Sequence, residues 1–293
     1  MQNERITPFL GPDIDHPSPE DAPCIILPVP YEGGISYGSG TARAPDAVLL
    51  ASAYLELYDE VLHCEPYRTG IATLGPPDHL ENPEKMYATV YAETKSLIDK
   101  DKFVILLGGD HSITSSYCKA LHEKYGTMSV IQLDAHADLR DSYEGSTLSH
   151  ACTMARVREY TRNTLQIGIR SISFEEAERV EAEHIALCTM HEYRTAAFDL
   201  ESALRNLPDP VFITWDVDVF DWSVIASTGT PEPGGLQWDE GMALLQKIVT
   251  MKNVIGFDVV ELACNENDRN SPFAVAKLIY KMIGFKYKAN GTR

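Results

Sequence analysis

The amino-acid sequence predicts an α/β fold: a single three-layer domain in which a mainly parallel sheet of about eight strands lies between helices. Two observations lead to this fold class. Short apolar runs alternate with longer amphipathic segments along the whole chain, and such alternation is typical of parallel sheets covered by helices on both faces. No repeat, low-complexity tract or linker divides the 293 residues, so one large domain is the simplest organisation.

Strands are predicted wherever a continuous apolar run of strand length indicates burial on both faces. In chain order these runs are Cys24 to Val29, Gly70 to Leu74, Phe103 to Leu107, Met128 to Leu133, Thr164 to Ile169, Ile185 to Leu187, Val211 to Thr214 and Val254 to Val259.

Helices are predicted in the longer segments between these runs. In order they are Ala44 to Tyr58, Pro83 to Lys100, Ser112 to Tyr125, Ser149 to Tyr160, Ser173 to Glu183, Thr195 to Asn206 and Asp239 to Met251. A last helix should start with Asn270 or Ser271 as its N-cap and Pro272 in its first turn, because these residue types favour those positions. Its apolar residues recur at helical spacing at Val275, Leu278, Ile279 and Met282.

Composition and charge narrow the classes of function. Apolar residues at 44% and charged residues at 23% are ordinary for a globular protein. A formal net charge of −18 argues against nucleic acid or an anionic membrane as partner, and it suits a cationic substrate. The start shows no apolar signal core, no stretch reaches the ~18 apolar residues of a membrane span, and the six cysteines form no C-x-x-C pair. We therefore expect a cytoplasmic protein with free thiols.

Three segments outside the predicted elements are notable. Residues 1–22 precede the first strand and are expected to be an N-terminal extension of the single domain 1–293. Two long turn-rich segments, Pro28 to Pro45 and Asp221 to Trp238, lie inside the domain. Loops of this length in a compact domain are usually functional.

Histidines and aspartates follow three of the predicted strands. The sequence places them at His111, at Asp134, His136 and Asp138, and at Asp216 and Asp218. The carboxyl ends of parallel strands meet at one edge of a sheet, where ligands bind. Carboxylates and imidazoles gathered there would be destabilised by burial and mutual repulsion unless a cation held them.

This ligand set indicates a site for two divalent metal ions that activates water for hydrolysis. Carboxylate oxygens with two imidazoles and no thiolate suit manganese better than structural zinc. Each motif has an ordinary alternative, since Asp-x-Asp is common on loops and Gly-Gly-Asp-His can form a tight turn with a satisfied histidine. Three such clusters at strand ends of one α/β domain seldom occur together by chance.

The same motifs resemble those of the ureohydrolases, the arginase and agmatinase family. The resemblance extends from Pro28-Val29-Pro30-Tyr31-Glu32-Gly33-Gly34 almost to the C-terminus and includes Gly-Gly-Asp-His-Ser at 108–112, Asp-Ala-His-Ala-Asp at 134–138 and Asp-Val-Asp at 216–218. It implies an arginase-like fold and two Mn²⁺ ions. One ion would bind His111, Asp134, Asp138 and Asp216, and the other Asp134, His136, Asp216 and Asp218. Asp134 and Asp216 would bridge them.

The resemblance also implies three catalytic residues. His150, in Ser149-His150-Ala151, matches a histidine that shuttles protons, and Glu261 matches a glutamate that receives the guanidinium group. Asp138 would accept a hydrogen bond from a hydroxide that bridges the metals and attacks the guanidinium carbon. The ordinary alternative for His150 is a helix-cap or core histidine, and without the resemblance Glu261 could be a solvent-facing residue at a strand end.

The Thr228-Gly229-Thr230-Pro231-Glu232-Pro233 segment is similar to the agmatinase type. It favours hydrolysis of agmatine to putrescine and urea, a step of polyamine biosynthesis, over hydrolysis of arginine; guanidinobutyrate and guanidinopropionate stay open. The loop from Tyr31 to Thr41 and the segment after His136 would set specificity. The resemblance further implies a homo-oligomer, a trimer or hexamer. Departures at Ala151, Asp221-Trp222 and 263–267 border the expected pocket and touch no metal ligand.

Two other classes of protein compete with this interpretation. Asp216-Val217-Asp218-Val219 resembles the nucleophile motif of haloacid-dehalogenase-like phosphohydrolases, but that motif normally lies on the first strand, whereas here it comes late. A metal-bound scaffold without turnover is the second alternative. The presence of all six candidate ligands together with His150 and Glu261 argues against loss of activity.

Overall fold

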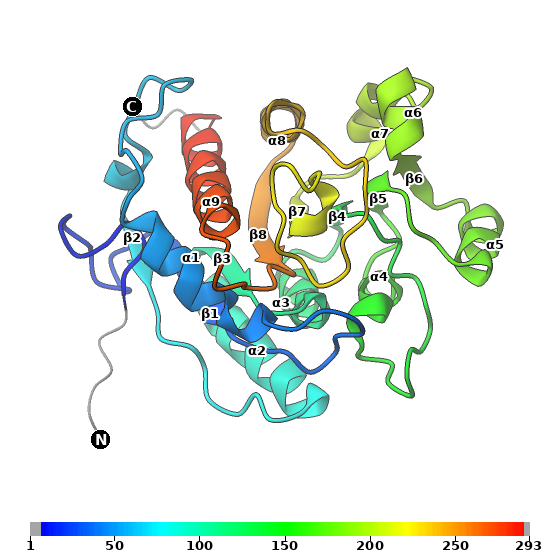
Figure 1. Ribbon diagram of the computed structural model, residues 1–293, viewed down its shortest axis with the longest axis horizontal. Coiled ribbons are helices and arrows are strands. Elements are labelled where there is room, and N and C mark those ends of the chain that lie inside the picture. Colours follow the sequence, from blue (N-terminus) through cyan, green and yellow to red (C-terminus); the bar gives the residue numbers. More distant parts are fainter. Residues whose placement is uncertain (1–6, 290–293) are drawn as a thin grey trace.

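The computed structural model describes residues 7–289. Within this range the strands form one sheet of eight parallel strands (Figure 1), so the predicted fold class is confirmed. The strands are β1 (Cys24–Val29), β2 (Ile71–Thr73), β3 (Phe103–Gly108), β4 (Ser129–Leu133), β5 (Thr164–Ile169), β6 (Ala186–Thr189), β7 (Val211–Asp216) and β8 (Val254–Val260). Their order across the sheet is β2-β1-β3-β8-β7-β4-β5-β6.

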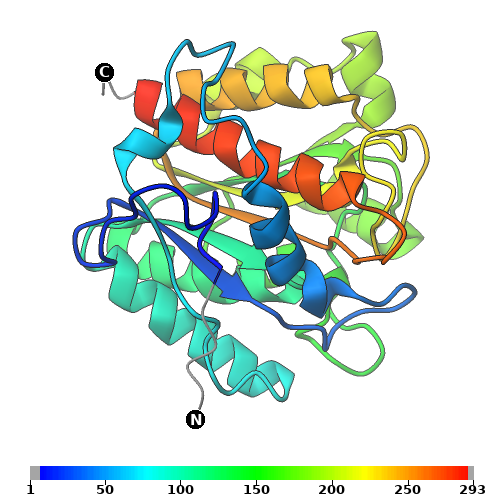
Figure 2. The same ribbon diagram turned by 60° about the vertical axis from the view of Figure 1, so that its left-hand side comes forward.

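Helices cover both faces of the sheet and complete three layers, as Figure 2 shows for α8 and α9 on one side and α2 on the other. One core joins the sheet to α1, α8 and α9, and a second joins it to α2, α3 and α4. The helices are α1 (Ala44–Ser52), α2 (Pro83–Ile98), α3 (Thr114–Tyr125), α4 (Thr153–Val157), α5 (Phe174–Glu183), α6 (Met190–Thr195), α7 (Leu200–Asn206), α8 (Trp238–Met251) and α9 (Asn270–Ala289). No helix in residues 7–289 is long and apolar enough to cross a membrane.

The register of the central strands sets their carboxyl ends side by side. Leu107 of β3 lies beside Val259 of β8, and Val260 of β8 lies beside Asp216 of β7. Leu133, the last residue of β4, lies beside Trp215 of β7. The segments that follow β3, β4, β7 and β8 therefore begin at one edge of the sheet.

The helix predicted from Ala44 to Tyr58 ends earlier, at Ser52. The Ser52 hydroxyl donates to the Leu49 carbonyl and accepts the Leu10 backbone N–H at 2.8 Å. Side-chain bonds of this kind compete with the helical pattern, and the chain continues as a turn beyond Ser52.

The helix predicted from Thr195 to Asn206 starts later, at Leu200, as α7, and the preceding short helix α6, which ends at Thr195, was not predicted. Ala196 adopts a left-handed conformation with φ of 52° and ends α6. The start of α6 is fixed by a capping box in which the Thr189 hydroxyl accepts from Glu192 N and the Glu192 carboxylate accepts from Thr189 N. The segment predicted as a helix from Ser149 to Tyr160 is shorter too: a 3-10 turn, η4 (His150–Cys152), leads into α4.

The last helix starts at Asn270, so the predicted cap residues Asn270 and Ser271 lie inside its first turn. Asp268 accepts their backbone N–H groups at 2.9 and 3.1 Å and takes the capping role instead.

The predicted N-terminal extension is described only in part, since residues 1–6 lie outside the described residues. Phe9 and Leu10 are buried and belong to the core beneath α1. Residues 7–22 form neither helix nor strand, and at Phe9 and Leu10 they pack onto the domain. The assignment of residues 1–22 as an N-terminal extension stays a prediction.

Candidate metal centre

The six histidines and aspartates predicted as ligands lie together at the carboxyl edge of the sheet. His111 starts the turn η3 (His111–Ile113) after β3, and Asp134 directly follows β4. Asp216 is the last residue of β7, and Asp218 lies in the turn η5 (Val217–Val219). Since β3, β8, β7 and β4 are consecutive neighbours in the sheet, their ends bring these side chains within contact distance.

His111 is the centre of a first cluster. Its Nδ1 lies 3.2 Å from Asp134 Oδ2, 3.0 Å from Asp138 Oδ2 and 3.5 Å from Asp216 Oδ2. All four side chains are buried. One ring nitrogen therefore faces three carboxylates from two other segments of the chain.

His136 is the centre of a second cluster. Its Nδ1 lies 2.9 Å from Asp218 Oδ2 and 3.6 Å from Asp134 Oδ1. Asp134 thus presents Oδ2 to His111 and Oδ1 to His136, and it is the carboxylate shared by two groups that could each hold a metal ion. Asp216 belongs to the first group only.

Backbone N–H groups fix the orientation of these carboxylates. Asp134 accepts from His136 N at 2.6 Å, Asp216 accepts from Asp218 N at 2.8 Å, and Asp218 accepts from Ala135 N at 2.9 Å. Asp134, His136 and Asp138 lie beyond the end of β4 at Leu133, so the alternation of side chains along a strand does not determine where they point. Asp138 reaches the first cluster through a left-handed conformation with φ of 52°, which is uncommon for a residue other than glycine.

Burial and mutual repulsion perturb the protonation of these groups. Burial and the charges of Asp218 and Asp134 raise the pKa of Asp216 well above its usual value. Burial lowers the pKa of His136, but the carboxylates of Asp218 and Asp134 outweigh it and raise this pKa to about 12. Even with both imidazoles protonated, the four aspartates leave an excess of negative charge.

The side chains fit a pair of divalent cations. Nδ1 of His111 and Oδ2 of Asp218 are buried and face groups of opposite charge at 2.9 to 3.5 Å, but none of these contacts has the geometry of a hydrogen bond, and buried polar atoms of this kind are well placed to bind a cation instead. The donors are carboxylate oxygens and imidazole nitrogens without thiolate, which suits manganese among the common divalent ions. Cations there would also cancel the excess negative charge.

His150 and Glu261 form a pair next to the first cluster. His150 Nδ1 donates to Glu261 Oε1 at 3.1 Å, and the backbone N–H of His111 donates to the same oxygen at 2.8 Å. Burial lowers the pKa of His150, but Glu261 outweighs it and raises the pKa to about 9. Glu261 is buried, so the solvent-facing alternative for this residue is wrong. His150 opens η4 and its Nε2 lies 3.2 Å from Ser36 Oγ.

A cavity of about 200 Å³ lies over the clusters. Its lining combines cluster residues with residues from three loops: Ser36, His136, Asp138, Arg140, Tyr143, His150, Ala151, Asp216 and Thr230. Glu261 lies behind His150 and is not part of the lining. The cavity is small and most of its lining side chains are polar, which suits a small polar substrate.

This arrangement can be compared with known proteins. The model of the arginase family matches residues 22–284. The chain belongs to the arginase family. The haloacid-dehalogenase-like alternative is therefore wrong, in agreement with the position of Asp216 on β7 rather than on the first strand.

Among its relatives, the chain is 38% identical to an N(1)-aminopropylagmatine ureohydrolase of Synechocystis sp., over 97% of this chain and 92% of the relative. It is 35% identical to an agmatinase of Pyrococcus horikoshii, over 90% and 92% of the two chains. The crystal structure of an agmatine ureohydrolase of Thermoplasma volcanium superposes with a TM-score of 0.86 at 28% identity, covering 93% of this chain and 92% of that one. The chain is thus an agmatinase-like ureohydrolase.

The cavity wall of this ureohydrolase from Tyr31 to Thr41 is held by two carboxylates. Asp110 accepts from Gly33 N at 2.9 Å and from Gly34 N at 2.7 Å. Glu32 accepts from Gly40 N and from Ala42 N at 2.6 and 3.1 Å. Sequence reasoning placed this loop at the substrate pocket but did not single out either carboxylate.

Thr214 and Asp258 support His111 from the side away from the cavity, and sequence reasoning missed both. Thr214 Oγ1 lies 2.8 Å from His111 Nε2, and Thr214 and Thr114 both form hydrogen bonds to the Asp258 carboxylate. Burial raises the pKa of Asp258 to about 6, although these hydrogen bonds and His111 oppose the rise. Both residues lie on buried strands, β7 and β8, where the sequence pattern indicated only core.

We expect Thr214→Val to weaken metal binding about 10- to 100-fold, because partners of this kind orient a ligating imidazole. Manganese titration followed by electron paramagnetic resonance would measure the change. Thr94→Val is the matched control, since Thr94 is buried and its hydroxyl bonds, among the described residues, only to carbonyls of α2. Equal metal affinities for the two variants would contradict the role of Thr214.

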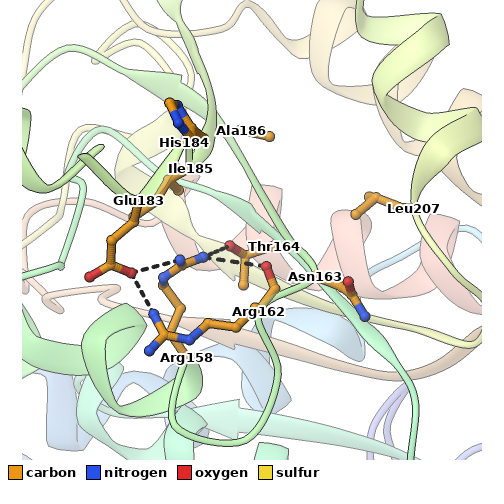
Figure 3. A pocket seen from close by; sticks show the side chains of 9 residues that line it. All are labelled: Arg158, Arg162, Asn163, Thr164, Glu183, His184, Ile185, Ala186 and Leu207. Atoms are coloured by element: carbon orange, nitrogen blue, oxygen red, sulfur yellow. Dashed lines mark hydrogen bonds and ion pairs between the residues drawn. The ribbon is translucent and has the colours of Figure 1, made fainter. Parts of the chain in front are cut away.

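A larger polar cavity of about 670 Å³ lies away from the centre, at the amino-terminal ends of β5 and β6 (Figure 3). Its two arginines, Arg158 and Arg162, both pair with Glu183. Arg158 also donates to Thr164 Oγ1 at 2.7 Å. These bonds tie α4, β5 and α5 together, and we assign the cavity no ligand.

Proposed function

We propose that this ureohydrolase uses two Mn²⁺ ions to hydrolyse agmatine, or a close relative of agmatine, to urea and an amine. The observation that carries the proposal is the pair of buried His/Asp clusters that share Asp134 beneath a small polar cavity. Membership of the arginase family adds the guanidino class of substrate.

The candidate ligands are the six residues of the two clusters. His111, Asp134, Asp138 and Asp216 would hold one ion, and Asp134, His136, Asp216 and Asp218 the other. Bound there, two divalent cations would lower the pKa of a water molecule so that it can attack the guanidinium carbon near neutral pH.

The chain's own residues would then move protons and hold the substrate. Asp138 lines the cavity and would accept a proton from the attacking water at its carboxylate. Protonated His150 carries a proton on Nε2, the nitrogen that faces Ser36 and not Glu261. As the bond from carbon to the leaving nitrogen breaks, this proton would pass to the amine.

Glu261 would receive the guanidinium group. Its Oε2 is buried and forms no hydrogen bond within residues 7–289. A side chain at Gly229 would place its Cβ 3.3 Å from this oxygen, so glycine keeps the approach to Oε2 open. A carboxylate oxygen without a donor, close to the cavity wall at Thr230, suits a planar guanidinium.

Agmatine is the preferred substrate because the relatives described above are named for agmatine or its aminopropyl derivative. The net charge of −18 is also favourable for a cationic amine.

A guanidino acid is a second candidate, and Arg140 favours it. Arg140 lines the cavity, stacks on Tyr143 at 5.3 Å and forms no ion pair among the described residues. A guanidinium in this position would repel the ammonium tail of agmatine and attract the carboxylate of guanidinobutyrate.

Urea release from a panel of guanidino compounds tests the proposal. Agmatine, N(1)-aminopropylagmatine, arginine, guanidinobutyrate and guanidinopropionate would be compared with manganese-loaded enzyme. We expect the highest kcat/KM for one of the two agmatine-type amines, whereas a preference for guanidinobutyrate would favour the second candidate. Release of phosphate from a phosphomonoester with no urea from any compound would overturn the reaction class, and no turnover at all would favour a scaffold.

Assembly is a further part of the proposal. We expect a homo-oligomer, a trimer or hexamer, in the cytoplasm. Exposed apolar side chains on α1 and at the start of α9, Leu50 and Phe273 among them, would favour burial between subunits. Sedimentation velocity would measure the assembly, and a monomer at micromolar concentration would contradict it.

A further inference from the structure

The cavity wall from Thr228 to Gly235 is held by two arginines that the reaction itself does not use. Arg170 donates to the carbonyls of Glu232 and Pro233 at 2.9 and 3.0 Å. Arg194 donates to the carbonyls of Gly234 and Gly235 at 3.2 and 2.6 Å. Four consecutive carbonyls are thus bound by two guanidinium groups.

The sequence of this wall makes such donors necessary. Pro231 and Pro233 have no backbone N–H, so the segment cannot form a regular hydrogen-bond ladder. Gly235 packs tightly against Phe220, where an added Cβ would lie 2.4 Å from the Phe220 carbonyl carbon. Carbonyls held in a non-repetitive conformation need donors from elsewhere, and a guanidinium offers five in one plane.

Arg170 connects this wall to the metal centre. The same guanidinium donates to the backbone carbonyl of Asp218 at 2.6 Å and to that of Gly168, at the end of β5, at 3.2 Å. Its side chain forms no ion pair with any residue in 7–289. Arg170 therefore acts on backbone carbonyls, and it links a candidate ligand to the wall of the cavity.

The wall reaches the site of reaction through Thr230 and Gly229. Thr230 lines the cavity, and the Gly229 carbonyl accepts from Gly38 N at 2.9 Å. Gly38 belongs to the opposite loop from Tyr31 to Thr41. A shift of the Glu232 to Gly235 stretch would therefore move Thr230 and the contact between the two loops.

We infer that Arg170 and Arg194 are positioning residues that hold the Thr228 to Gly235 wall against the metal centre and so determine substrate binding. The effect on substrate binding rests on the proposed function. The holding of the wall rests on the hydrogen bonds alone. Lysine keeps the charge but cannot reach several carbonyls in fixed directions, so a lysine variant should not replace arginine at position 170.

The test compares Arg170→Lys, Arg194→Lys and wild type in their manganese-loaded forms. We expect Arg170→Lys to raise the KM of the preferred guanidino compound about tenfold, since small displacements at a binding wall are costly, while kcat changes less than about threefold. Hydrogen exchange of the 228–235 backbone should become faster in both variants. Arg194→Lys should have the smaller kinetic effect, because Arg194 does not contact the metal-binding segment.

Arg158→Lys is the matched control. Arg158 is a buried arginine with several hydrogen-bond and ion-pair partners, and it lies at the amino-terminal end of the strands, away from the metal centre. The inference is overturned if Arg170→Lys leaves both KM and the exchange of 228–235 unchanged. It is also overturned if Arg170→Lys changes kcat, metal content and hydrogen exchange throughout the chain together, to the same extent as Arg158→Lys does, because that result would indicate a general loss of stability. If wild type releases no urea from any compound, the proposed function fails, while the exchange experiment still decides the positioning role.

Discussion

Replacing Asp216 by asparagine is expected to remove at least one metal ion per chain and to lower urea release by about a thousandfold or more. Asp216 Oδ2 lies 3.5 Å from His111 Nδ1 and belongs to the first cluster. The amide is neutral and offers one acceptor oxygen, so the carboxylate proposed to bridge the two ions would lose both a ligand oxygen and its charge. Elemental analysis of metal content, together with urea release, would measure the two effects.

Asp99→Asn serves as the control for this change, because Asp99 is exposed at the end of α2 and its one ion pair within residues 7–289 is with Lys95. It should keep the full metal content and rate. An Asp216→Asn enzyme with two metal ions and an undiminished rate would show that Asp216 is not a ligand.

Replacing His150 by asparagine is expected to lower kcat about 10²- to 10⁴-fold, the usual range for loss of a proton-transferring group, with both metal ions still bound. His150 lines the cavity and contacts Glu261 and Ser36, and within residues 7–289 its ring forms no hydrogen bond or ion pair with a candidate metal ligand. Loss of metal in the variant would mean that the role of His150 is structural.

The pH profile gives His150 a second test. Its pKa is raised to about 9, so the ring is protonated below that value and loses its proton above it. If the protonated ring delivers a proton to the leaving amine, the wild-type rate should fall as the pH rises through about 9. The stabilising pair with Glu261 is lost over the same rise, since a raised histidine pKa means stability that is present at lower pH. His150→Asn should lack the fall in rate, and a fall that persists would assign it to another group.

The strands were predictable because their apolar runs are continuous. Burial on both faces of a parallel sheet requires such runs, and all eight were located from them. Helix ends were less predictable. The end of α1 depends on Ser52, whose hydroxyl bonds to Leu49 and to the distant Leu10, and the second of these contacts exists only in the folded chain.

The candidate ligands were predictable for a different reason. Histidine and aspartate directly after buried strands are costly unless something binds them, so their position in the sequence already indicated a metal site. Which carboxylate meets which imidazole was not predictable. Asp138 reaches His111 through a left-handed backbone conformation, and Asp134 is shared because β4 lies next to β7 in the sheet.

The sequence by itself thus determined the fold class, the strands and the chemical character of the site, because these depend on residue types and on their spacing along the chain. Only the tertiary structure decided how Thr214 and Asp258 support His111, and how Arg170 binds the Glu232 to Gly235 wall. The contact between His111 and Thr214 joins residues 103 positions apart, and the contact between Arg170 and Glu232 joins residues 62 positions apart, so neither leaves a local pattern in the sequence. Every residue type has a backbone carbonyl, so the sequence does not indicate which residues accept hydrogen bonds from an arginine that donates to carbonyls.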